Sequence, residues 1–511
     1  MTAGRAARLE LTARGLVLAA TLLAFALRAL SLLSQSLWRD EVDALLFATR
    51  PLSQLLAMFR QPGQNGPLFF LALRPWLAAA GHSEYALRFP SVLFGTLAIP
   101  LTYVLLRRMA DLPVALIGAL LMAVAPYGVW YGQEAKMYAL LTVLGPASLL
   151  AILWLRERRG WQPWVALYVV TSVAAYTHLL AVLIIPIQAL WLVLIPWTTQ
   201  PLRRAAAGLA YLAALALPYV PLLAWAPRIL TSNFQTGHPF VALDLILQIL
   251  AGAFSRGVLG IEPISLLPYM VALVAGVFVW PVLAAGRVEG QPRGGAEWLW
   301  RTSEGRSARW RSVLLLLFWL LLPPILIYLV SLGMPIFTDR YLIWAMPAYL
   351  ALLACGLVAL GRWWRPLGIA AAGVILALNG WSMYLQATEP IKADFRSAAA
   401  YVVARYQPGD KIMYQIPYNR YTFSYYASGR DDPEDPAWAG LEGPYTNYGM
   451  SEAEADAWIA TRLGGTHVVW LVASEVPMWD ARNLTEQWFD ANATATDRGD
   501  FARVRVIRYE R

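Results

Sequence analysis

The amino-acid sequence predicts a polytopic α-helical membrane protein with a small α/β domain outside the membrane at its C-terminal end. Hydrophobic residues make up 59% of the 511-residue chain and charged residues only 14%, whereas soluble domains carry roughly 25% charged residues. Long apolar runs recur through residues 1–386 and then stop, and residues 387–511 carry charges and turn signals instead. We therefore expect a transmembrane domain over 1–386 and a separate domain over 387–511.

The apolar runs set the number of membrane spans. We recognise about eleven runs of the roughly 20 mostly apolar residues that a transmembrane helix needs, near residues 13–33, 87–106, 113–130, 137–155, 162–180, 182–198, 205–225, 265–285, 312–332, 341–360 and 367–386. Backbone groups must be paired within lipid, so these spans are expected to be helices. The first span follows three arginines and lacks a convincing small-residue cleavage site, which predicts an uncleaved signal anchor.

The placement of arginine predicts the orientation. Of the alternate loops, one set is richer in arginine, including Arg107-Arg108, Arg203-Arg204 and the loop before residue 312, and such loops lie on the cytoplasmic side. The N-terminus is then cytoplasmic, and an odd number of spans places residues 387–511 outside the cytoplasmic (inner) membrane. The same pattern accounts for the formal charge of +9, so we do not expect nucleic acid as a partner; membrane lipids are the expected surroundings.

Two outer loops are unusually long, 34–86 and 226–264. The first alternates amphipathic and polar stretches, which predicts short helices lying in the membrane interface. In the C-terminal domain, strand-like runs at 411–415, 467–472 and 502–507 alternate with helical patterns at 394–406 and 452–463. This alternation predicts the small α/β domain.

Two clusters of charged residues are expected on the outer side. Arg39, Asp40 and Glu41 follow the first span, and Glu134 and Lys136 lie in the segment Tyr131–Tyr138. Charges beside lipid are costly unless they serve structure or function. Carboxylates at such a site can accept a proton, hold a cation or stabilise positive charge, so two of them converging at one face suggest a catalytic cleft. Each cluster also has a purely structural interpretation, as a solvated loop pair or as the end of a span.

Histidine and cysteine give no metal-binding pattern. The four histidines lack a local ligand spacing, and the single cysteine, Cys355, excludes both an intrachain disulfide and a cysteine-based metal site. We therefore predict no cofactor, although a divalent metal remains compatible with the sequence. His178 is expected at the outer end of a span, where a histidine can also serve only in packing. Asp339-Arg340 can likewise be only an ion pair that anchors the mouth of a helix.

A set of short motifs, in order along the chain, resembles the multispanning glycosyltransferases of the GT-C fold, whose relatives include protein O-mannosyltransferases and bacterial lipid A aminoarabinose transferases. Leu37–Glu41 resembles their "LWxDE" signature, and further matching pieces are Gly66–Phe70, Arg88–Ser91, Gln133–Tyr138, Tyr176–His178 and Arg340-Tyr341 with Pro347. Two positions depart from the family pattern: Asn65-Gly66 replaces His-Pro or Lys-Pro, which puts a donor-phosphate contact from that loop in doubt, and Lys136 replaces the commoner arginine.

The resemblance implies transfer of a sugar from a polyprenyl-phosphate carrier to a lipid, glycan or protein acceptor on the outer face of the membrane, with inversion. Loop 34–86 would be the catalytic loop. Asp40 would act as general base, with Glu41 or Glu134 orienting the substrate or the base. Phosphate or sugar would be bound by the side chains of Lys136, Tyr138, His178, Arg340, Tyr341, Arg60 and Arg88.

Two other function classes stay open at this point. A transporter or flippase of a lipid-linked saccharide would place ionisable residues near the bilayer midplane and often shows paired repeats, neither of which the sequence indicates. A polysaccharide polymerase or ligase would share the outer loops and the chemistry, but would use a diphosphate-linked oligosaccharide. The identity of the lipid that is released separates this class from the transferase.

Overall fold

The computed structural model describes residues 3–58, 66–158, 160–194, 200–223, 238–259, 263–283, 305–429 and 431–511. Their contacts divide the chain into two compact units. The first comprises Met1–Ser31, Pro51–Leu73 and Arg88–Gln386, and the second comprises Leu32–Arg50, Arg74–Leu87 and Ala387–Arg511. The second unit therefore combines the C-terminal residues with two earlier segments, 32–50 and 74–87, that largely belong to the loop predicted over 34–86.

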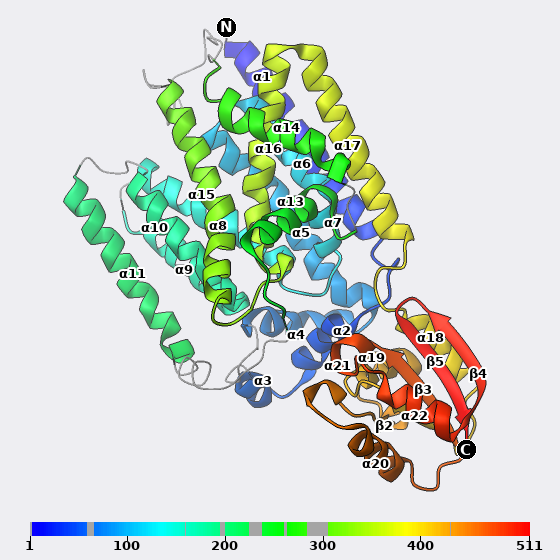
Figure 1. Ribbon diagram of the computed structural model, residues 1–511. Coiled ribbons are helices and arrows are strands. Elements are labelled where there is room, and N and C mark those ends of the chain that lie inside the picture. The colour runs from blue at the N-terminus through cyan, green and yellow to red at the C-terminus, as the bar shows by residue number, and fades with distance from the viewer. Residues whose placement is uncertain are drawn as a thin grey trace. The chain divides into compact units, whose positions relative to one another are not determined.

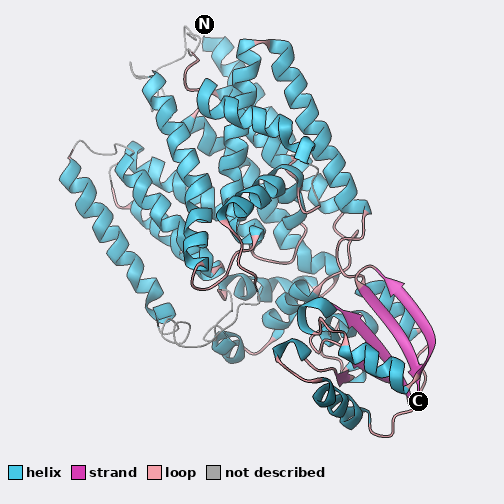
Figure 2. Ribbon diagram, viewed as in Figure 1, coloured by secondary structure: helices cyan, strands magenta, loops and turns pink. Residues whose placement is uncertain are grey.

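The first unit is built from helices (Figures 1 and 2). In chain order these are α1 (Ala3–Leu30), α3 (Leu52–Met58), α5 (Glu84–Met109), α6 (Leu112–Ala123), α7 (Pro126–Tyr131), α8 (Tyr138–Glu157), α9 (Gln162–Thr177), α10 (Ile184–Leu194), α11 (Pro201–Leu223), α13 (Leu243–Arg256), α14 (Leu267–Val274), α15 (Gly305–Ser331), α16 (Met346–Trp363) and α17 (Arg365–Thr388). Helix α4 (Leu68–Ala80) contributes residues to both units, and the first residues of α5 and the last residues of α17 belong to the second unit.

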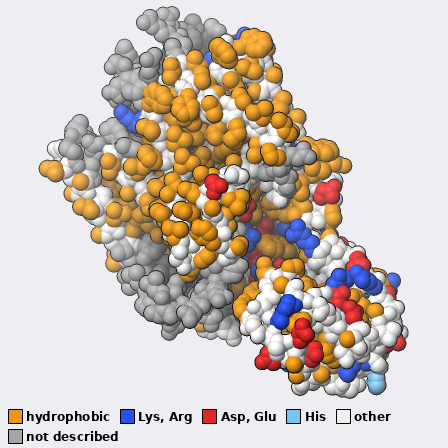
Figure 3. Space-filling model, in the orientation of Figure 1, with side chains coloured by type: hydrophobic (Ala, Val, Ile, Leu, Met, Phe, Trp, Pro, Cys, Tyr) orange, Lys and Arg blue, Asp and Glu red, His pale blue; other side chains and the backbone are white. Residues whose placement is uncertain are grey.

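The described helices confirm a multi-pass membrane protein. Six of them are long and apolar enough to cross a bilayer: Ala7–Leu30, Glu84–Met109, Tyr138–Leu155, Ala308–Ser331, Asp339–Trp363 and Arg365–Thr388. Shorter apolar helices lie at five further places, among them Leu112–Ala123 and Leu179–Val193. Hydrophobic side chains make up much of the described surface of this unit in the view of Figure 3. The total of about eleven spans stays a prediction, because several predicted spans correspond to short helices.

Helix α16 lies at the centre of the first unit. The apolar stretch of the helical segment that contains α16 is 100% buried inside the protein, whereas only 22% of the apolar stretch of α17 is buried. Close packing at this centre depends on glycine: a Cβ atom on Gly356 would lie 1.7 Å from the carbonyl oxygen of Ala272, and one on Gly276 would lie 2.0 Å from that of Leu352. Small residues at such contacts let membrane helices approach backbone to backbone.

The second unit contains a five-stranded sheet with the order β2-β1-β3-β5-β4. The strands are β1 (Lys411–Tyr414), β2 (Leu441–Glu442), β3 (Val468–Ser474), β4 (Thr494–Phe501) and β5 (Val504–Glu510). β1 pairs in parallel with β2 and β3, whereas β5 pairs antiparallel with β3 and β4. Three of these strands, β1, β3 and β5, lie where the sequence predicts them.

Helices cover both faces of this sheet. Trp470 and Val472 of β3 pack with α18 (Phe395–Val403) and α19 (Asn419–Ala427), whereas Val469 and Leu471 pack with α20 (Glu452–Leu463) and α22 (Leu484–Asn492). Side chains alternate across a strand, so an apolar run such as β3 serves two cores at once. The unit also contains α2 (Arg39–Thr49) and α21 (Val476–Trp479). The predicted C-terminal α/β domain is confirmed.

Candidate active site

The predicted catalytic and binding residues are divided between the two units. Asp40 and Glu41 belong to the second unit, whereas Glu134, Lys136 and the residues grouped with them belong to the first. The convergence of the two acidic groups on one cleft stays a prediction. Arg60 lies outside the described residues.

In the second unit, Asp40 lies in the first turn of α2. Trp38, in an extended conformation, precedes the helix as its N-cap residue, and Asp40 and Glu41 are the acidic residues of the first turn. The positive end of the helix dipole favours carboxylates there. The Asp40 side chain is 14% exposed, and its Oδ1 accepts from the Arg39 guanidinium at 3.4 Å. A small part of the Asp40 side chain therefore stays exposed, and a substrate can reach the carboxylate there.

Glu41, the next residue, has the opposite environment. Its side chain is fully buried, and its carboxylate forms an ion pair of 2.8 Å with Lys392, whose side chain is 8% exposed. Val42, Leu45 and Leu46 are buried on the same helix. Neighbouring residues on a helix point about 100° apart, so the burial of Glu41 leaves Asp40 at the side of the helix.

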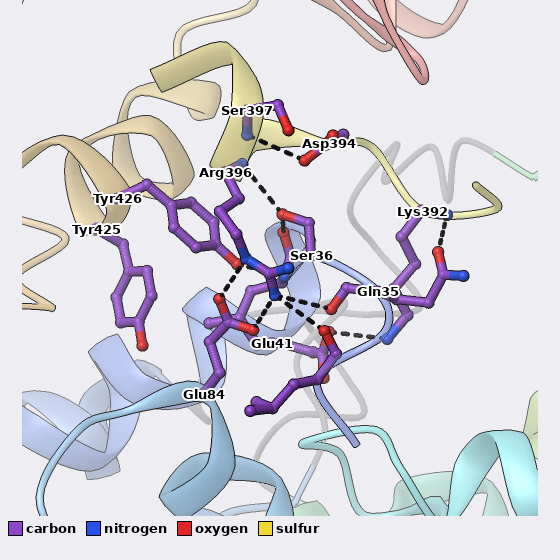
Figure 4. Close-up of polar contacts among 12 residues, drawn as sticks. Gln35, Ser36, Glu41, Glu84, Lys392, Asp394, Arg396, Ser397, Tyr425 and Tyr426 are labelled. Atoms are coloured by element: carbon purple, nitrogen blue, oxygen red, sulfur yellow. Dashed lines mark hydrogen bonds and ion pairs between the residues drawn. The ribbon is translucent and has the colours of Figure 1, made fainter. Parts of the chain in front are cut away.

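Hydrogen bonds hold the chain that enters α2 (Figure 4). The backbone N–H of Leu37 donates to the Tyr426 hydroxyl at 2.6 Å, and the N–H of Arg396 donates to the Ser36 hydroxyl at 3.3 Å. The Arg396 guanidinium forms two bonds to the Glu84 carboxylate. In this way residues from three separate parts of the sequence fix the segment that carries Asp40.

Arg39 faces a second polar group of the same unit. Its guanidinium lies 4.6 Å from the ring centre of Tyr418 and 3.7 Å from a carboxylate oxygen of Glu475. The Tyr418 hydroxyl donates to Glu475 and accepts from the Trp479 indole. Burial disfavours the charge on Arg39, but the attraction of Asp40 and then of Glu475 outweighs it and raises the pKa of Arg39. Arg39 is therefore a permanent cation beside Asp40.

In the first unit, Glu134 and Lys136 lie in the turn between α7 and α8, and both are buried, with 1% and 6% exposed. The Gln133 amide anchors this turn by donating to the carbonyls of Leu27 and Arg28 and to the Ser31 hydroxyl. The Lys136 ammonium lies 5.8 Å from the ring centre of Phe70. The turn therefore carries a buried carboxylate and a buried cation two residues apart in the helical unit.

Aromatic rings follow this turn on the side of α8. Tyr138 lies edge-on to Tyr131 with ring centres 5.1 Å apart, and His178 lies between Tyr138 at 6.3 Å and Tyr341 at 4.8 Å. The Nδ1 atom of His178 accepts from the N–H of Leu180 at 3.2 Å. Its buried Nε2 atom has no hydrogen-bond partner among the described residues. His178 is therefore packed as a ring between Tyr138 and Tyr341.

Two arginines complete the predicted set in this unit. The Arg340 guanidinium lies 5.8 Å from the ring centre of Tyr341. Arg88, in α5, is 1% exposed. Arg340 also acts on His238, since burial, and after it the positive charge of Arg340, lowers the pKa of that imidazole. Of the binding residues predicted in this unit, His178 therefore contacts the rings of both Tyr138 and Tyr341, and Arg340 adjoins Tyr341.

The two groups offer complementary chemistry. The second unit presents a carboxylate next to a guanidinium, which suits proton acceptance from a hydroxyl. The first unit combines cations with aromatic rings, which suits an anionic group attached to an apolar or sugar-like body. Among the described residues, no group of three or more His, Cys, Asp or Glu side chains could hold a metal ion.

Comparisons with known proteins address the fold. The family model for dolichyl-phosphate-mannose-protein mannosyltransferases matches residues 63–225. The crystal structure of ArnT from Cupriavidus metallidurans in the apo state is similar to this chain, with a TM-score of 0.58 and 13% sequence identity. The alignment covers 97% of this chain and 98% of the ArnT chain. The chain has the GT-C fold.

Two further structures agree with this assignment. ArnT from the same organism bound to undecaprenyl phosphate gives 15% identity and a TM-score of 0.53, with 97% of this chain and 98% of ArnT covered. The archaeal oligosaccharyltransferase AglB from Archaeoglobus fulgidus, in complex with an inhibitory peptide and a dolichol-phosphate, gives 13% identity and a TM-score of 0.51, with coverages of 93% and 72%. No curated protein sequence matches the chain. The predicted GT-C resemblance is confirmed.

Several residues around Asp40 were not predicted from the sequence. Lys392 and Arg396 precede the sheet, and Glu84, Tyr426 and Glu475 lie in three other segments. One signal in the sequence could have indicated Lys392. The chain has only three lysines among 41 basic residues, namely Lys136, Lys392 and Lys411, and two of these three are buried beside the candidate residues.

Proposed function

We propose that this protein is a glycosyltransferase that moves a sugar from a polyprenyl-phosphate carrier to an acceptor hydroxyl, with inversion at the anomeric carbon and with Asp40 as the general base. The observation that carries this proposal is the partly exposed Asp40 at the start of α2 in a chain with the GT-C fold. The crystal structure of the fold neighbour ArnT has undecaprenyl phosphate bound, and the neighbour AglB is in complex with a dolichol-phosphate, which supports a lipid-phosphate donor.

The reaction needs few groups. The acceptor oxygen attacks the anomeric carbon as the bond from that carbon to the phosphate oxygen breaks, and the hydroxyl proton passes to Asp40. Positive charge develops on the sugar ring, and a nearby carboxylate stabilises it. The leaving polyprenyl phosphate is already an anion, so it needs cations rather than a proton donor.

The first unit supplies the cations in this proposal. Lys136, Arg340 and Arg88 bind the donor phosphate, as does Arg60. Glu134 orients the substrate, while Tyr138, His178 and Tyr341 contact the sugar or the phosphate. The ring contacts among these three residues support their assignment to one binding surface. The acceptor is a lipid, a glycan or a protein.

The topology of the proposal follows from the arginine pattern. The protein lies in the cytoplasmic (inner) membrane with its N-terminus inside, and residues 387–511 lie outside as a domain of their own beside the transmembrane domain 1–386. Catalysis then takes place on the outer face, where loops 34–86 and 226–264 lie. Arginine-rich loops on the cytoplasmic side support this orientation.

The test is transfer of label from a panel of radiolabelled polyprenyl-monophosphate sugars, with membranes that contain the wild type or Asp40→Asn. Label should reach an acceptor with the wild type only, since loss of a general base costs roughly 10²- to 10⁴-fold. Asp456→Asn is the matched control, because Asp456 is exposed on α20. Full activity of a folded Asp40→Asn protein would contradict the role of Asp40.

The same assay separates the other function classes. Release of a polyprenyl diphosphate would indicate a polymerase or ligase of a diphosphate-linked saccharide. Movement of the lipid-linked sugar across purified vesicles, without a covalent product, would indicate a flippase. Absence of transfer from every donor by folded wild-type protein would contradict the proposed transferase.

A further inference from the structure

The ion pair between Glu41 and Lys392 joins two parts of the sequence that are 351 positions apart. Glu41 has no exposed side-chain surface, and the Lys392 side chain is 8% exposed. A buried charge is costly unless a partner compensates it, and removal of one partner leaves the other uncompensated. The pair is therefore a specific link between the first turn of α2 and the chain that leads into the sheet.

The residues next to Lys392 make further bonds to the same segment. The Gln35 side-chain oxygen accepts from the N–H groups of Ile391 at 3.1 Å and Lys392 at 3.2 Å, and its amide nitrogen donates to the carbonyl of Glu389 at 2.7 Å. Arg396 bonds Ser36 through its N–H, as Figure 4 shows. We refer to residues 389–396 as the clamp segment, because they contact both Gln35-Ser36 and Glu41.

These contacts fix the rotation of α2 about its own axis. Glu41 and the apolar residues Val42 and Leu45 are buried, and Asp40 lies one residue before Glu41 on the same turn. If Glu41 is held, the direction of Asp40 is set, because successive helical side chains keep a fixed angle. A displacement of about 1 Å at a reacting group can cost 10²-fold in rate.

We propose that the clamp segment positions Asp40, with Lys392 as its central positioning residue and Glu41 as the group through which Lys392 acts. In this assignment Glu41 is an anchor of α2 and does not touch the sugar. The inference deepens the proposed function and rests on it for the catalytic role of Asp40. It assigns to the start of the C-terminal domain the task of holding the base.

Hydrogen–deuterium exchange tests the hold itself and needs no substrate. In the full-length protein in detergent, Lys392→Met should speed amide exchange in peptides that cover residues 37–46 at least tenfold, while peptides from β3 and β5 stay protected. The matched control is Lys411→Met, since Lys411 is exposed at the start of β1. If Lys392→Met unfolds the whole sheet, Gln35→Ala is the second variant. It leaves both charges in place and removes the bonds of the Gln35 side chain to Glu389, Ile391 and Lys392. It should likewise speed exchange in the peptides that cover residues 37–46.

Kinetics test the consequence for catalysis. Lys392→Met should lower kcat about 10²-fold and leave the KM for the lipid-linked donor unchanged, because the base is displaced while the donor site is intact. The double variant Glu41→Met/Lys392→Met removes both buried charges, and an apolar pair of similar volume is often tolerated in place of a buried ion pair. It should return kcat to within about tenfold of the wild type. This rescue is specific to a positioning role.

The outcomes are distinct. Equal exchange and equal kcat in Lys392→Met and Lys411→Met would overturn the clamp. A double variant that is as inactive as Lys392→Met, or worse, would show that Glu41 acts on the substrate itself and would also overturn it. If the wild type transfers no sugar from any donor, the proposed function fails, and the exchange measurement alone decides whether the clamp segment holds α2.

Discussion

The first turn of α2 and the turn before α8 each present an acidic residue close to a cation, yet they are held in different ways. At α2, the buried Glu41 is paired with Lys392, which is remote in the sequence. At the turn before α8, Glu134 and Lys136 are two residues apart, and an uncharged amide, that of Gln133, anchors the turn to the end of α1. The comparison suggests that α2 carries the proposed base, whose side chain must point in one direction for the reaction. The turn before α8 carries groups that are proposed to bind the substrate.

The largest effect should come from shifting the carboxylates by one methylene. Asp40→Glu keeps the charge but moves it, so transfer should fall about 10²-fold. Glu134→Asp, at a site proposed to bind, should cost less than about tenfold. Steady-state transfer with purified protein measures both. A greater loss in Glu134→Asp than in Asp40→Glu would reverse the proposed division of roles.

Removal of the cation in the turn should have the next largest effect. Lys136→Met keeps the length of the side chain and removes a charge proposed to bind the donor phosphate. A bond to a charged group contributes about 2 kcal/mol, so kcat/KM for the donor should fall about 30-fold, mainly through KM. Lys411→Met is the control, since that lysine is exposed. An unchanged KM in Lys136→Met would exclude this lysine from the phosphate site.

The anchor of the turn can be weakened without touching a charged residue. Gln133→Leu removes three hydrogen bonds of the side-chain amide, to Leu27, Arg28 and Ser31. The free energy of unfolding should fall by about 1.5 kcal/mol, because buried acceptors lose their donor. Thermal unfolding in detergent measures this, with Gln162→Leu at an exposed position as control. A loss no larger than in the control would mean that the amide does not hold the turn.

The smallest effect is expected at the entrance to α2. Tyr426→Phe removes the hydroxyl that accepts from the N–H of Leu37, at a cost of about 1 kcal/mol. Amide exchange at Leu37 should become faster, while Tyr448→Phe, at an exposed tyrosine, should leave it unchanged. Equal exchange at Leu37 in both variants would show that this bond does not protect the segment.

Local patterns explain which parts of the molecule could be predicted from the sequence. The apolar runs and the strands β1 and β3 carry their own periodicity, and the fold class follows from them. Strand β4 was missed because its residues, Thr494–Phe501, are polar and mostly exposed at the sheet edge. The predicted helix at 452–463 has a clear start, since Ser451 and Glu454 form a capping box.

The candidate site was predictable only in part, for a different reason. Charges next to an apolar span mark Asp40 and Glu41 in the sequence itself. Their difference in burial depends on Lys392, and a contact between residues 351 positions apart leaves no local pattern. The two carboxylates therefore look equivalent in the sequence, while the structure separates a partly exposed acid from a buried one.

The central claim is tested most directly by the stereochemistry of one product. Purified wild-type protein would be given a polyprenyl-monophosphate sugar of known anomeric configuration and an acceptor identified from the donor panel. NMR would then assign the anomer of the product, and the released lipid would be analysed by mass spectrometry. The account predicts the opposite anomer and release of a polyprenyl monophosphate. Retention of configuration would contradict a single displacement with Asp40 as base, and release of a diphosphate would contradict the proposed donor.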